Sequence, residues 1–86
     1  MTKVTDKADN FKVYPNPTKG SFVLIGEPVT EQLHLVIYNN IGQIVWQSKQ
    51  FFSGKINISL ENFPKGVYLL KISNGKQLKT IKIMKI

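Results

Sequence analysis

Residues 32–47 read QLHLVIYNNIGQIVWQ, which is an alternating run, a turn and a returning run. Leu33, Leu35 and Ile37 would share one face of an extended chain, because successive side chains of a strand point to opposite faces. Residues 39–42 contain asparagines and a glycine, which tolerate the positive φ angles of tight hairpin turns. The stretch therefore predicts a β-hairpin with one buried face, whose second strand carries the single tryptophan of the chain.

The same pattern continues on both sides of this hairpin. Alternating apolar residues are interrupted by Pro and Gly turns at intervals of roughly 8 to 12 residues, and no apolar spacing holds a helical period. Asn74-Gly75 is the strongest hairpin turn in the chain. Ten Ile against a single Ala also favour strands. We therefore predict an all-β sandwich or barrel of about seven strands, with Leu35, Ile56, Ile58 and Leu70 buried. The expected strands are 11–14, 21–25, 32–39, 43–47, 55–60, 67–73 and 77–86.

Length and charge narrow the class of protein. With 86 residues the chain has room for one domain, which we place at 11–86 after a flexible lead-in at 1–10. The formal charge is +7, and all 12 basic residues are Lys. The lack of Arg argues against a nucleic-acid partner, because Arg makes the bidentate contacts to bases and phosphates. There is no Cys to form disulfides, and no apolar run approaches the ~20 residues that a membrane-spanning helix needs.

The residues that catalysis or metal binding would need are scattered. His34 is the only His and would lie within a strand, and the five carboxylates fall in the lead-in and in turns. No Ser lies in a G-x-S-x-G context, and the glycines are isolated turn residues. We expect no catalytic residue, no metal site and no cofactor. Trp46 could stack on a sugar, but we expect it to pack inside the sandwich instead.

Four short sequence motifs follow one another along the chain in a fixed order. They read YPNPTKG at 14–20, IYNNIGQ at 37–43, LENFPKGVYLLKI at 60–72 and KIMKI at 82–86. Together they extend over nearly the whole domain. Their order and spacing resemble the C-terminal sorting domain of type IX secretion, the export route of Bacteroidetes bacteria. The resemblance implies an Ig-like antiparallel β-sandwich that acts as a non-catalytic export signal.

The resemblance also implies a route and a set of partners. The sequence would be the tail of a longer protein, with a cargo domain N-terminal to it in the same chain. A shuttle protein and the outer-membrane translocon would read the domain after it reaches the periplasm. A sortase would then remove it and leave the cargo on the cell surface or outside the cell. We expect cleavage within or just upstream of residues 1–10, the only long segment without strand signals.

The family motifs supply candidate residues for translocon recognition, namely Pro15, Asn16, Pro17, Gly20, Gly66, Tyr68, Lys82 and Lys85. Each has a structural alternative, because a motif can define turns and core packing and thereby create the recognised surface. We expect the last strand near a sheet edge, where it could accept a strand from a partner or simply complete the sandwich. An accessory Ig-like or carbohydrate-binding module of a secreted protein is the alternative function.

Overall fold

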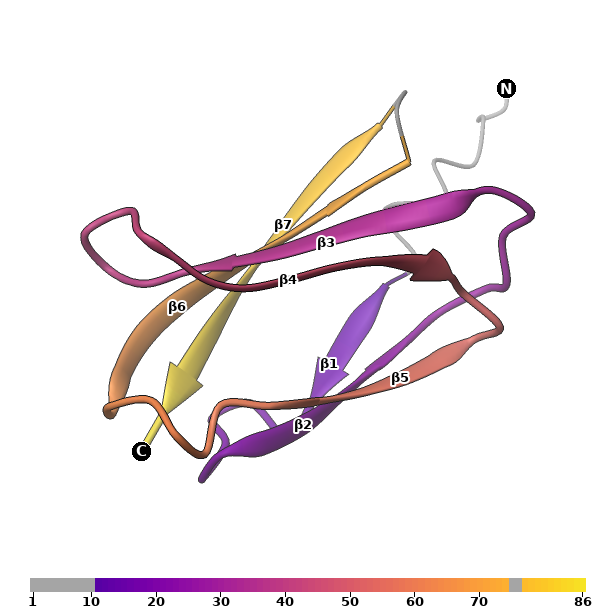
Figure 1. Cartoon of the computed structure of the whole chain (residues 1–86). Coiled ribbons are helices and arrows are strands. Elements are labelled where there is room, and N and C mark those ends of the chain that lie inside the picture. The colour runs from indigo at the N-terminus through magenta and orange to yellow at the C-terminus, as the bar shows by residue number, and fades with distance from the viewer. Residues whose placement is uncertain (1–10, 75–76) are drawn as a thin grey trace, which may run out of the picture.

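The computed structural model describes residues 11–74 and 77–86, which form seven strands (Figure 1). The strands are β1 (Lys12–Tyr14), β2 (Ser21–Ile25), β3 (Gln32–Tyr38), β4 (Ile44–Phe51), β5 (Lys55–Ser59), β6 (Gly66–Ser73) and β7 (Leu78–Lys85). They form a three-stranded sheet in the order β1-β2-β5 and a four-stranded sheet in the order β4-β3-β6-β7. All strand pairs within the two sheets are antiparallel. The described residues contain no helix that is long and apolar enough to cross a membrane.

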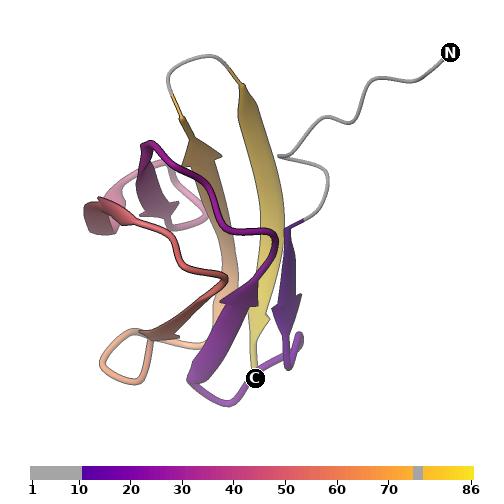
Figure 2. The same ribbon diagram turned by 90° about the vertical axis from the view of Figure 1, so that its right-hand side faces the viewer.

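The two sheets face each other as the layers of a sandwich (Figures 1 and 2). The chain crosses between the sheets three times, after β2, after β4 and after β5. If β1 to β4 are named A, B, C and C′, and β5 to β7 are named E, F and G, the sheets have the orders A-B-E and C′-C-F-G. This connectivity is that of an Ig-type sandwich. The prediction of an all-β, Ig-like sandwich is therefore confirmed.

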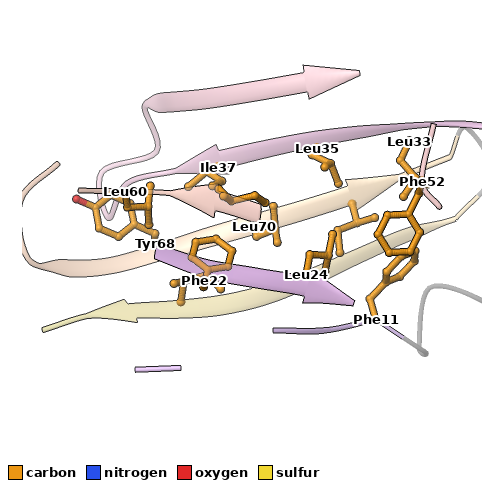
Figure 3. Packing of buried hydrophobic residues seen from close by; sticks show 13 residues of the cluster. Phe11, Phe22, Leu24, Leu33, Leu35, Ile37, Phe52, Leu60, Tyr68 and Leu70 are labelled. Carbon is orange, nitrogen blue, oxygen red and sulfur yellow. The ribbon is translucent and has the colours of Figure 1, made fainter. Parts of the chain in front are cut away.

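The core lies between the inner faces of the two sheets (Figure 3). Near one end of it the rings of Phe11 and Phe52 meet edge to face, with centroids 5.2 Å apart. Ile56 was predicted to be buried but is only half-buried, because it lies near the start of the edge strand β5, where the core covers it less than it covers Ile58. The other three residues predicted to be buried are confirmed, and they are Leu35, Ile58 and Leu70.

The structure departs from the predicted strands mainly at β4, which runs on to Phe51 instead of ending at Gln47. Its full length pairs with β3. The part of β4 beyond Gln47 was not predicted because the polar residues Ser48 and Gln50 occupy inward positions. They break the alternation of apolar and polar residues that indicates a strand. The two side chains satisfy each other, since Gln50 Nε2 donates to Ser48 Oγ at 2.8 Å. Trp46 packs against the core, as predicted.

The hairpin predicted at Asn74 joins β6 to β7, which pair along their whole length. The side chain of Asn74 supports the turn, because its Oδ1 accepts the N–H of Gln77 at 2.9 Å. Gly75 of the predicted turn and the predicted flexible lead-in at 1–10 lie outside the described residues. The pairing places β7 at the edge of the four-stranded sheet, as predicted.

Candidate functional site

At one end of the sandwich, hydrogen bonds join the first, third and fourth motif segments near the C-terminus, and the β3–β4 turn of the second segment lines a pocket with the β5–β6 loop (Figure 1). This motif end consists of the β1–β2 loop (15–20), the β3–β4 turn (39–43), the β5–β6 loop (60–65) and the last residues of β7 with Ile86. Contacts here join residues that are 66 positions apart in the chain. The fold therefore turns four separate sequence motifs into one continuous region.

The β1–β2 loop is bonded to the outer edge of β7. Asn16 Nδ2 donates to the C=O of Lys82 at 2.7 Å, and the N–H of Met84 donates to Asn16 Oδ1 at 3.0 Å. The N–H of Thr18 donates to the C=O of Met84, and the N–H of Ile86 donates to the C=O of Thr18, both at 2.8 Å. The chain's own loop thus occupies the outward backbone groups at the end of β7. A partner strand could pair here only by displacing that loop.

Thr18 lies at the centre of this loop and is 1% exposed. Its Oγ1 donates to the C=O of Ser21 at 2.6 Å and accepts the N–H of Gly20 at 3.0 Å. The β1–β2 loop also lies very close to the β5–β6 loop. If residue 20 had a Cβ, that atom would lie only 2.7 Å from Cγ of Glu61. Gly20 was predicted as a turn glycine, but its function in the structure is to let two loops approach closely. Thr18 was not among the residues predicted for the site.

Lys85 fastens β7 to the β5–β6 loop. Its Nζ donates to the C=O groups of Leu60, Glu61 and Phe63 at distances between 2.5 and 3.2 Å. A Lys ammonium has three donors, so these carbonyls satisfy all of them. The side chain is half-buried among these partners. Lys85 is therefore an internal link between two motif segments.

Tyr68 and Gly66 shape the exit of the β5–β6 loop. Tyr68 is 3% exposed, and its hydroxyl donates to the C=O of Pro64, four residues upstream. This contact is the tyrosine corner of Ig-type sandwiches, at the start of strand F. Gly66 has a φ of 149°, which a residue with a side chain rarely adopts, although a Cβ there would have no neighbour within 4 Å. The backbone conformation, and not a lack of space, requires glycine at this position.

Three of the eight recognition candidates present side chains to solvent without a bond to another part of the motif end. Pro15 and Pro17 line, together with Ile86, a shallow groove of about 480 Å³ beside the C-terminus. Lys82 lies on the outer face of the four-stranded sheet, opposite Leu69. The other five candidates act inside the molecule, through hydrogen bonds, close approach or backbone conformation.

The motif end combines exposed prolines, an exposed apolar residue at the end of β7 and lysines, which is an arrangement suited to binding a partner. Among residues 11–74 and 77–86, no group of three or more His, Cys, Asp or Glu could hold a metal ion. His34 lies on the exposed face of β3, where its Nε2 is 3.3 Å from Oε1 of Gln47.

A solved structure supports the fold. The chain is similar to PorZ of Porphyromonas gingivalis, which is described as an essential bacterial surface component of the type IX secretion system. The TM-score is 0.69 at 20% sequence identity, over 93% of this chain and 12% of the PorZ chain. At this level of identity the likeness shows a shared fold. This chain corresponds to only a small part of the length of PorZ.

The family comparison is more specific than the structural one. No curated protein matches the sequence significantly. The model of a family described as the secretion system C-terminal sorting domain matches residues 12–86. That range contains nearly the whole described sandwich and all the residues of the motif end. The chain therefore belongs to the family of secretion system C-terminal sorting domains, the type IX family that its motifs resemble.

Proposed function

We propose that this domain is an export signal that directs a cargo, N-terminal to it in the same chain, across the outer membrane through the type IX secretion system. The observation that carries the proposal is the convergence of the four motif segments on one end of a single sandwich. A partner can read such a region as one folded surface, although its parts are distant in sequence. Membership of the sorting-domain family supports the same function.

We assign the candidate residues to two roles within this function. Pro15, Pro17 and Lys82 have exposed side chains, so they are the ones that a shuttle protein or the translocon would contact. The remaining candidates hold the loops and β7 in the arrangement that presents this surface. They are Asn16, Gly20, Gly66, Tyr68 and Lys85.

Removal of the domain by a sortase completes the proposed sequence of events. Phe11 is 6% exposed and belongs to the core, so cleavage beyond it would cut into the packed domain. We place the cleavage within or just upstream of residues 1–10. The cargo then reaches the cell surface or the medium without its signal.

The test is a fusion of residues 1–86 to the C-terminus of a periplasmic reporter in a host with a type IX system. Cell fractionation should find the reporter at the surface or in the medium, and a strain without the translocon should retain it in the periplasm. Mass spectrometry of the exported reporter should place its new C-terminus before Phe11. Retention in the periplasm of the competent host, with the domain folded, would refute the proposal.

The alternative of a carbohydrate-binding module has less support. Its sugar-stacking candidate was Trp46, which is half-buried and packs against the core. A stacking platform needs the face of its aromatic ring open to the ligand. We therefore do not propose sugar binding for this domain.

A further inference from the structure

The outer face of the four-stranded sheet differs in charge from the loops around it. Strands β3, β4, β6 and β7 contain no Asp or Glu. The register of the sheet places three lysines on its outer face, and they are Lys49, Lys71 and Lys82. The carboxylates of the described residues lie in loops, at Glu27, Glu31 and Glu61. The face is therefore a positive surface that favours acidic partners and disfavours a second copy of itself.

Part of this positive face is an apolar groove beside the β3–β4 turn. Tyr38 lies opposite Leu69 across the strand pair, and Val67 lies two residues along β6 on the same face. Val67 and Leu69 are 37% and 38% exposed. These side chains line a groove of about 480 Å³ together with Asn39, Asn40, Gly42 and Lys71. The volume falls in the range of roughly 300–1,000 Å³ that is typical of binding pockets.

Contacts within the chain hold the walls of the groove in place. Asn39 Oδ1 accepts the N–H groups of Ile41 and Gln43 at 3.1 and 2.9 Å, which orders the turn on one side. Lys71 Nζ lies 4.8 Å from the ring centroid of Tyr38, in a cation–π contact. A fixed cation therefore borders an apolar floor. Because both walls are ordered before binding, a ligand would lose little free energy to ordering the site.

We infer that this groove binds an extended, acidic segment of a protein of the export machinery. An apolar side chain of the segment enters the groove over Leu69, and a neighbouring carboxylate pairs with Lys71. The inference rests on the proposed export function, because it names where one partner of that function docks. A flat membrane surface fits a concave groove less well. Nucleic acid fits less well because the groove has an apolar floor and the chain has no Arg.

The groove can be tested on the 86-residue chain by itself. We would titrate the ¹⁵N-labelled protein with three synthetic peptides and follow its amide resonances. The first alternates Glu with Leu and Phe, the second alternates Glu with Ser, and the third alternates Lys with Leu and Phe. The first peptide should shift the amides of Tyr38, Gly42, Leu69 and Lys71, and the other two should not. Shifts spread over all lysines, or binding to vesicles of anionic phospholipid in preference to the first peptide, would overturn the inference.

Matched substitutions on the same face distinguish binding in the groove from general attraction of the peptide to the positive face. Lys71→Gln should weaken binding of the first peptide by about 1.4-fold to fivefold, the effect of losing one exposed charge pair. Lys49→Gln removes the same charge from the same face outside the groove and should leave binding unchanged. Leu69→Ser should abolish binding, while Leu78→Ser, at an equally outward but distant position, should not. Equal effects of a groove variant and its control would refute the groove.

The same variants in the reporter fusion connect the groove to export. Lys71→Gln and Leu69→Ser should lower the exported fraction while Lys49→Gln and Leu78→Ser preserve it. Thermal melts identify any variant that fails to fold, and Lys71→Gln, which keeps most of the side chain, decides the outcome if Leu69→Ser is unstable. Normal export of both groove variants would overturn this inference and leave the proposed function intact. Failure of the unmodified domain to export the reporter would instead refute the proposed function.

Discussion

Replacing Lys85 with Met is the sharpest test of whether the motif end holds the last strand in place. Met keeps the length and the apolar stem of the side chain but removes the ammonium group. The change therefore deletes the three hydrogen bonds to the C=O groups of Leu60, Glu61 and Phe63. Packing of the stem along the β5–β6 loop is largely preserved, so the loss measures the ammonium contacts.

The expected cost follows from the geometry of these contacts. A hydrogen bond to a charged group contributes about 1.5–3 kcal/mol, but three bonds from one half-buried ammonium are not additive. The carbonyl of Glu61 can also regain a water molecule, because its contact with Lys85 is exposed. We expect a total loss of about 2–3 kcal/mol. A chain of 86 residues has a total stability of roughly 4–13 kcal/mol, so this is a large share.

The free energy of unfolding can be measured by urea titration with the fluorescence of Trp46, the single Trp of the chain. The melting temperature should fall by about 10–20 °C for a domain of this size. Lys82→Met is the matched control, because it removes the same charge from an exposed position on the same strand and should cost less than about 0.5 kcal/mol. If the two variants are equally stable, the ammonium contacts of Lys85 do not hold β7 and the reasoning fails.

Three further changes test the other links of the motif end. Tyr68→Phe removes only the hydroxyl that reaches Pro64 and should cost about 1–2 kcal/mol in urea titrations, and no measurable change would contradict the tyrosine corner. Gly66→Ala should cost about 1–3 kcal/mol through backbone strain, whereas a gain in stability would show that the residue does not need its positive φ. Deletion of 84–86 removes three of the four hydrogen bonds between the β1–β2 loop and the end of the chain, together with the anchor of the β5–β6 loop, so we expect a loss of folded β-structure by circular dichroism at 37 °C. A truncated domain that melts like the intact one would mean that the ending is dispensable for folding.

The sequence predicts the strands well wherever alternation and turn chemistry agree. Leu33, Leu35 and Ile37 alternate with outward residues and are buried as expected. The prediction is wrong in the second half of β4, where Ser48 and Gln50 face inward and pair with each other. Alternation of apolar and polar residues identifies a strand only when the inward residues are apolar. Two polar residues that face inward and bond to each other therefore make the sequence of a strand resemble that of a loop.

The sequence predicts the site residues as turn and strand residues but not their contacts. Asn16 reads as a turn residue between two prolines, and nothing local indicates that its amide bonds to β7, 66 positions away. Lys85 was predicted as a recognition candidate on a strand near a sheet edge, yet carbonyls of another loop surround its ammonium. Such contacts depend on how the two sheets are stacked, and that is a property of the whole chain.

The arrangement of the motif end explains why recognition and folding are difficult to separate in a domain of this kind. The end of β7 has its outward backbone groups occupied by Asn16 and Thr18, and its Lys85 is fixed within the β5–β6 loop. A change at any of these positions alters the arrangement of all three segments. Lys82 is therefore the recognition candidate whose substitution can change a contact surface with the least effect on folding, because its side chain is exposed and only its backbone C=O bonds to Asn16.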